Sequence, residues 1–202
     1  MKTKILSLVT VAAIVLGIGS QANAAGTKDS AKTHEVSTVL NNVSKINKIE
    51  VRGNVVVYVS DNEADQVKVY NKYYEESALV QSQNGTLRIS SYADQKLVVW
   101  VKAADLRNIV AYDNAEVRSF GKLSPIDLKV TLNNNAYAKL DLDGHAANIT
   151  VNDRAKADLM GNVDECTLRY AHSATVNSTD FAAARMTRMV DAEAAKDQYA
   201  GL

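Results

Sequence analysis

The sequence predicts an all-β fold, a parallel β-solenoid with rungs of roughly 20 residues, on the basis of three observations. From Ile46 onward, short runs rich in Val, Ile, Leu, Thr and Tyr alternate with clusters of Gly, Asn and Asp, which is typical of many brief strands. Alanines recur at a nearly constant spacing in the second half of the chain. The chain holds one proline and shows no long 3.6-residue pattern before its C-terminal segment, so the sequence gives helices little support.

The first 24 residues have the pattern of a secretory signal peptide. Lys2 and Lys4 supply a positive start, residues 5–18 are apolar, and Ala22-Asn23-Ala24 offers small residues for cleavage. We therefore expect residues 1–24 to be removed and the protein to be exported. No later stretch approaches the roughly 20 apolar residues of a membrane-spanning helix, so we expect no transmembrane segment after cleavage.

The mature chain has the length of one ordinary domain. Removal of residues 1–24 from the 202-residue chain leaves 178, of which residues 25–45 are polar and predicted to be a flexible leader. The domain is therefore expected to span residues 46–202. Loss of Lys2 and Lys4 leaves 21 basic and 23 acidic residues, a formal net charge of −2. This balance gives no reason to expect a nucleic-acid partner.

The alanine spacing defines an internal repeat. Two short strands and a polar corner cannot bury their apolar edge alone, but stacked copies can. We therefore expect the recurring alanines to form an inward file where the interior narrows at a corner. The file consists of Ala115, Ala136, Ala155, Ala174 and Ala192, separated by 21, 19, 19 and 18 residues.

The last copy of the repeat departs from the others. Arg188 and Lys196 stand at positions that are apolar or small in the earlier copies. An unfinished stack would expose strand edges to other chains, so we predict a terminal cap from about residue 186.

The first half of the chain repeats less regularly and leaves a second fold open. Asn84-Gly85 lies between two apolar runs, which is a hairpin signal. Gly53-Asn54 is placed similarly, and both pairs would also suit solenoid corners that need a positive φ. An antiparallel β-sandwich is therefore the alternative fold.

Several segments resemble a known family. Residues 49–57, 85–89 and 97–111, together with the alanine corners, are similar to the head GIN domain family, exported proteins of Gram-negative bacteria labelled "putative auto-transporter adhesins". The resemblance covers about residues 46–189. It implies a right-handed parallel β-helix and an exported location, in the periplasm or on the cell surface. The family's corners are typically rich in Ser-Gly-Ala, whereas the corner at Asp153 reads Asp-Arg-Ala, so the corner geometry stays open.

One polar column could carry chemistry. Asp113, Asn134, Asp153 and His172 each stand two residues before an alanine of the file. In a stack, adjacent members would lie about 5 Å apart, where acids can share a proton or hold a cation. Asn and Asp also occur at such positions because their side chains bond turn backbone, and we favour this role. Without histidine or cysteine ligands at suitable spacing, we expect no metal and no cofactor.

The sequence shows no catalytic constellation, so we expect a non-catalytic cell-envelope protein, an adhesin-like binding or structural module. The candidate partners are a glycan and a cell-envelope protein. Tyr70, Tyr73, Tyr74 and Trp100 could stack on sugar rings or anchor a protein. The alternative function is a carbohydrate-active enzyme that uses the acidic corner column.

Overall fold

A computed structural model of the chain describes residues 37–40, 43, 45–70 and 78–191. The predicted signal peptide, residues 1–24, lies outside these ranges, as does Ala192. Within the described ranges, no helix has the length and apolar character that crossing a membrane requires.

The described residues form thirteen strands, all of which belong to one sheet. The short alternating runs of the sequence become the strands, and the Gly, Asn and Asp clusters become the turns between them. The strands are β1 (Ser37–Leu40), β2 (Lys48–Gly53), β3 (Val55–Asp61), β4 (Gln66–Tyr70), β5 (Ala78–Gln83), β6 (Thr86–Ser91), β7 (Leu97–Ala103), β8 (Asn108–Ala111), β9 (Glu116–Ser119), β10 (Asp127–Leu132), β11 (Tyr137–Val151), β12 (Lys156–Ala171) and β13 (Thr175–Asp191).

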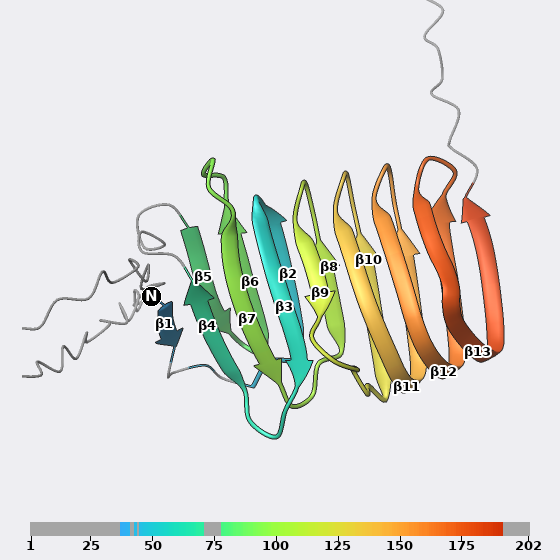
Figure 1. Cartoon of the computed structure of the whole chain (residues 1–202), viewed down its shortest axis with the longest axis horizontal. Coiled ribbons are helices and arrows are strands. Elements are labelled where there is room, and N and C mark those ends of the chain that lie inside the picture. The colour runs from blue at the N-terminus through green and yellow to red at the C-terminus, as the bar shows by residue number, and fades with distance from the viewer. Residues whose placement is uncertain (1–36, 41–42, 44, 71–77, 192–202) are drawn as a thin grey trace, which may run out of the picture. The chain divides into compact units, whose positions relative to one another are not determined.

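The sheet curls back on itself and so forms two facing layers (Figure 1). In layer A, β1, β4, β7, β3 and β9 lie side by side in that order and meet the start of β11. Layer B consists of β5, β6, β2, β8 and β10, which lie side by side in that order. The last of them, β10, pairs with the end of β11. The long strands β11, β12 and β13 run through both layers, which makes the sheet continuous.

The core lies between the two layers. In β7, Leu97, Val99 and Val101 are buried while the residues between them are more exposed, because successive side chains of a strand point to opposite faces. Val99 pairs in register with Val57 of β3, so equivalent apolar side chains lie next to each other across strands. Burial of each such side chain contributes about 1.5–3 kcal/mol.

Residues at the repeat spacing lie beside one another in the C-terminal half. Parallel pairing places Val130 next to Ile149, and Ile149 next to Leu168. Ala115, Ala136 and Ala155 are completely buried and Ala174 is half-buried, while Ala192 lies outside the described residues.

The prediction of a right-handed parallel β-helix is wrong, because the sheet is mixed. The pairings β1–β4, β4–β7 and β5–β6 are antiparallel. Asn84 and Gly85 have φ angles of 49° and 76°, and this turn with two positive φ values closes the β5–β6 hairpin. The antiparallel sandwich is not found either, since most pairings are parallel and one continuous sheet supplies both layers.

The strand order also departs from a simple coil. In a coil each rung lies next to the rung that follows it in the chain, but here β3 lies between β7 and β9. In the same way, β2 lies between β6 and β8. Strands β2 and β3 are therefore inserted between strands that follow them in the chain.

Two predicted segments overlap described strands. β1 lies within the predicted leader, residues 25–45, and pairs with β4. The start of the predicted cap, residues 186–191, lies in β13. The rest of the predicted cap lies outside the described residues.

Candidate functional site

Four aromatic rings gather on the outward side of layer A. Tyr58 stands between the buried Val57 and Val59, so the alternation of the strand turns its ring away from the core. Trp100 occupies the paired position on β7, and its ring stacks on that of Tyr58 with centroids 4.8 Å apart. We call Tyr58, Tyr70, Trp100 and Phe120 the aromatic cluster.

The other two rings of the aromatic cluster contact Trp100. Phe120 meets it edge to face at 4.9 Å, and Tyr70 lies tilted at 6.4 Å. Lys68 places its ammonium group 4.7 Å from the centre of the Tyr70 ring, a cation–π distance. The cluster thus combines an apolar surface with a positive charge at its border.

Exposure distinguishes Phe120 from the other rings. Tyr58, Tyr70 and Trp100 are half-buried against one another, whereas Phe120 is 60 % exposed. Cross-strand aromatic pairs stabilise a sheet by about 0.2–1 kcal/mol each, which accounts for Tyr58 and Trp100. Phe120 follows the end of β9 and forms no such strand pair, so its ring leaves an apolar surface exposed to solvent.

A charged region continues from the aromatic cluster along the same outward side. Arg118 of β9 lies next to Tyr58 in register. Its guanidinium bonds the Glu116 carboxylate at 2.8 Å and lies 5.3 Å from the centre of the Tyr137 ring. Lys96 forms a second ion pair with Glu116. Glu116 thereby holds both cations, and Arg118 lies beside an aromatic ring.

Two pKa values reflect this packing. Burial raises the pKa of Glu116, but hydrogen bonds from Lys96 and Arg118 outweigh it, and the net pKa is lowered. The Tyr137 hydroxyl donates a 2.5 Å hydrogen bond to Asp158. Burial and this bond raise the pKa of Tyr137 to about 12. Tyr137 therefore stays neutral at ordinary pH, and Glu116 stays charged.

The predicted corner column occupies successive turns. Asp113, Asn134 and Asp153 have φ angles of 60°, 60° and 55°, a left-handed conformation that Asn and Asp tolerate better than most residues. The Asp113 amide N–H donates to the Asn134 side-chain oxygen at 3.3 Å, and the Asn134 N–H donates to the Asp153 carboxylate at 2.7 Å. The Asn134 and Asp153 side chains therefore each bond the backbone of the turn before their own.

The column offers little for catalysis. Asn134 lies between the two acids, and the Asp113 carboxylate also accepts a 3.0 Å hydrogen bond from the Tyr92 hydroxyl. His172 is exposed on the next turn, and among the described residues its side chain forms no hydrogen bond with the column. In the part of the chain that the structure describes, no three His, Cys, Asp or Glu side chains gather as metal ligands.

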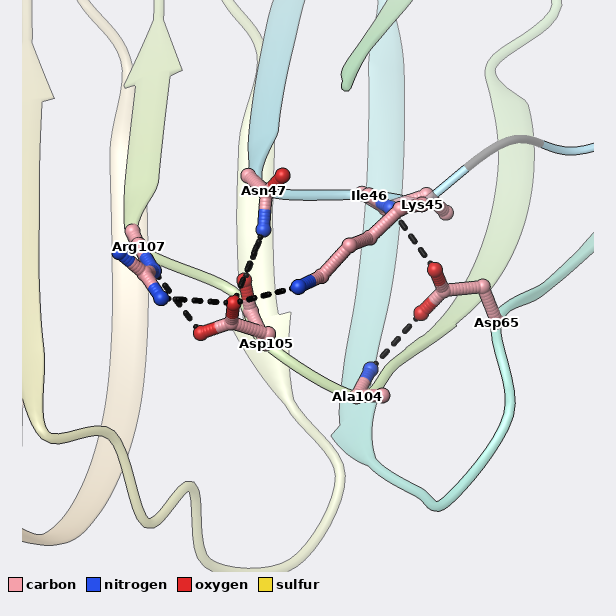
Figure 2. A network of polar contacts seen from close by, with 7 residues as sticks. All are labelled: Lys45, Ile46, Asn47, Asp65, Ala104, Asp105 and Arg107. Carbon is pink, nitrogen blue, oxygen red and sulfur yellow. Dashed lines mark hydrogen bonds and ion pairs between the residues drawn. The ribbon is translucent and has the colours of Figure 1, made fainter.

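A separate polar network ties turns together at one end of the strands (Figure 2). Asp105 pairs with Arg107 at 2.9 Å and with Lys45 at 3.1 Å, and it accepts a hydrogen bond from Asn47 at 3.2 Å. Hydrogen bonds from Arg107 and Lys45 lower the pKa of Asp105 to about 2. The network thus joins the entry to β2 to the turn before β8.

Asp65 completes this network from the turn before β4. Its two carboxylate oxygens accept from the Ile46 and Ala104 amides, each at 2.8 Å. An open groove of about 1020 Å³ lies beside it, where Asp61 and Asp127 alternate with Arg107 and Lys129. Both signs of charge therefore line this groove.

The sequence predicts part of the aromatic cluster. Of the aromatic residues that it singles out, Tyr70 and Trp100 belong to the cluster, while Tyr73 and Tyr74 lie outside the described residues. It does not single out Tyr58 or Phe120. The signal for Tyr58 is its place between two buried valines, the same pattern that surrounds Trp100.

Comparison with known proteins identifies relatives. A family model described as "Putative auto-transporter adhesin, head GIN domain" matches residues 45–200. No curated protein matches the sequence.

Several solved structures share the fold. A protein described as a "putative adhesin" from Bacteroides fragilis is 13 % identical, with a TM-score of 0.67 over 77 % of this chain and 76 % of that one. Another, from Parabacteroides merdae, is 14 % identical with a TM-score of 0.64 over 77 % of each chain. A "putative lipid binding protein" from Parabacteroides distasonis is 10 % identical, with a TM-score of 0.58 over 77 % of this chain and 78 % of that one.

Proposed function

This chain belongs to the family described as "Putative auto-transporter adhesin, head GIN domain", and we propose that it is a non-catalytic module of the cell envelope that binds a glycan on the aromatic cluster. The proposal depends on one observation above all. Aromatic rings, among them the 60 % exposed Phe120, are grouped on the side of layer A that faces away from the core.

The chemistry of the aromatic cluster suits a sugar. Aromatic rings supply a rigid, largely apolar surface at little cost in side-chain entropy, and a sugar ring offers an apolar face of similar size. The cluster lies on a pleated sheet rather than in a closed pocket, which suits an extended chain of sugars. Polar groups at its border, Lys68 and Arg118, can bond hydroxyl groups.

Export and an envelope location have two lines of support. The first is the signal-peptide pattern of residues 1–24. The second is the adhesin-like description of the family. The mature chain is thus proposed to act in the periplasm or on the cell surface.

The alternative, a carbohydrate-active enzyme, has weaker support. It would require Asp113 and Asp153 as free acids, but each accepts a hydrogen bond that stabilises its corner. A carboxylate engaged in this way is less available as a general base.

A glycan array with the purified mature chain tests the proposal. We expect the wild type to bind a defined set of glycans and Phe120→Ala to bind them roughly 2- to 10-fold more weakly. Ile126→Ala is the matched control, because Ile126 is also apolar and 80 % exposed but lies in the loop before β10. Absence of glycan binding by the wild type, or equal binding by both variants, would overturn the proposal.

A further inference from the structure

A groove next to the aromatic cluster shares only Arg118 with the surface proposed above to bind the glycan. It has a volume of about 580 Å³ and is open to solvent on the outward side of layer A. It is lined by Glu116, Arg118, Asn135, Tyr137, Arg154 and Lys156, which we call the cationic groove.

Strand register makes the groove a continuation of the aromatic cluster. Trp100 pairs with Tyr58, Tyr58 pairs with Arg118, and Arg118 pairs with Lys139. These side chains form one row that runs across β7, β3, β9 and β11. Because neighbouring strands lie about 4.8 Å apart, the step from β3 to β12 is on the order of 14 Å. A ligand that crosses the strands would meet rings first and cations next.

Positive charge is in excess in the lining of the groove. Among the described residues that line it, the cations are Arg118, Arg154 and Lys156, and the carboxylate is Glu116. Glu116 already pairs with both Lys96 and Arg118. The Asp158 carboxylate accepts a hydrogen bond from the Tyr137 hydroxyl.

Two cations of the groove are left for a ligand. Among the described residues, the side chains of Arg154 and Lys156 form no ion pair, and both are exposed. An arginine fork binds a carboxylate or sulfate through two parallel hydrogen bonds, and a lysine adds a point charge. The stacked position of Arg118 over Tyr137 fixes a third donor beside them.

We propose that the glycan bound by this protein is an acidic polysaccharide, whose anionic groups occupy the cationic groove while neighbouring sugar rings lie on the aromatic cluster. The inference rests on the proposed glycan binding and specifies its substrate class. The ligand must carry a carboxylate or sulfate on a sugar chain. These anionic groups must be spaced so that sugar rings can contact the aromatic cluster while the charges lie in the cationic groove.

The test compares polymers that differ in charge. Binding of the mature chain to polygalacturonate, to dextran sulfate and to neutral dextran is measured by calorimetry at low and at high salt. We expect the wild type to prefer an acidic polymer over neutral dextran by at least about tenfold, with a preference that shrinks at high salt. Tighter binding of polygalacturonate would indicate that the groove prefers a carboxylate, and tighter binding of dextran sulfate that it prefers a sulfate.

Two double variants localise the charge. Arg154→Ala/Lys156→Ala removes the free cations of the groove, and we expect at least about a tenfold loss of affinity for the acidic polymer. Arg88→Ala/Lys129→Ala removes the same charge from exposed positions on β6 and β10, and we expect less than about a twofold change. Equal melting temperatures of the two variants check that both are folded.

The outcomes separate this inference from the function on which it rests. If Phe120→Ala weakens binding but the groove variant binds like its control, the acidic-glycan inference is overturned while glycan binding stands. If both double variants lose affinity equally, general charge attraction explains the result and the inference is overturned. If vesicles of an anionic phospholipid bind and no polysaccharide does, both proposals are overturned.

Discussion

Tyr58 on β3 and Trp100 on β7 lie directly opposite each other in a parallel strand pair, and their rings stack at 4.8 Å with planes 25° apart. This contact lies on the outward side of the sheet and is not part of the core. It serves two purposes, because it stabilises the strand pair and supports the more exposed Phe120 at the edge of Trp100.

Removal of the indole should therefore affect both stability and binding. We expect Trp100→Ala to lower the free energy of unfolding by about 1–2 kcal/mol, since it removes three ring contacts of a half-buried side chain. Phe120→Ala should lower it by less than about 0.5 kcal/mol. Urea denaturation measures both values. Equal stability of the Trp100→Ala variant and the wild type would contradict the supporting role of this ring.

The buried alanines leave no room for a larger side chain. We expect Ala155→Leu to cost about 1–3 kcal/mol, because Ala155 is completely buried between stacked corners. Ala182→Leu on β13 is the control, since Ala182 is exposed and should tolerate leucine within about 0.5 kcal/mol. Thermal melting followed by circular dichroism compares the two. An unchanged melting temperature for Ala155→Leu would show that the corner can expand.

The corner column should respond to loss of its side-chain acceptor and not to loss of its charge. Asp153→Asn keeps an oxygen for the Asn134 N–H and tolerates a φ of 55°, so we expect a change below about 0.5 kcal/mol. Asp153→Ala loses the hydrogen bond and fits this conformation poorly, at a cost of about 1–3 kcal/mol. Chemical denaturation gives both numbers. Measurable glycan cleavage that either substitution abolishes would instead favour the catalytic role.

Asp105 should make the fold sensitive to acid. Its folded pKa is about 2 and its ordinary value is 3.8, so its contribution is fully present above the ordinary value and is lost as the pH falls through about 2. We expect Asp105→Asn to lower the melting temperature near neutral pH, and the difference from the wild type to vanish as the pH falls below about 2. Asp94→Asn, at an exposed position, is the control. A constant difference between wild type and Asp105→Asn at all pH values would contradict this linkage.

The all-β class could be predicted because it depends on local patterns. Alternation in runs such as Leu97–Ala103 fixes which side chains face the core, and the structure follows that alternation. The repeat spacing likewise places Ile149 beside Leu168. These features depend on residues that are close in sequence or that recur at one spacing.

The partner of each early strand could not be predicted. β3 and β7 carry nearly equivalent valine patterns, so hydrophobic alternation specifies their faces but not which strand lies on which side. The antiparallel strands β1 and β4 depend on which edge is left open once β7 is in place, a long-range property. The Asn84-Gly85 pair is a hairpin signal, but the positive φ that it supplies suits a solenoid corner equally well.

The candidate site was predicted only in part for a related reason. Trp100 could be recognised by residue type, but its neighbours come from other segments of the chain, Tyr58 from β3 and Phe120 from just after β9. In the sequence, Arg154 and Lys156 look like ordinary surface residues. Only the folded structure shows that they line the same groove as Tyr137.

The insertion of β3 between β7 and β9 constrains the order in which the chain can fold during synthesis. A chain that emerges N-terminus first releases β2 and β3 long before Ser119, the last residue of β9, has appeared. Until then at least one backbone edge of β3 is unpaired. The segment that holds β2 and β3 must therefore stay incompletely folded or be shielded by a chaperone. Closure of such distant pairs is slow, so a delay between synthesis and completion is built into the connectivity itself.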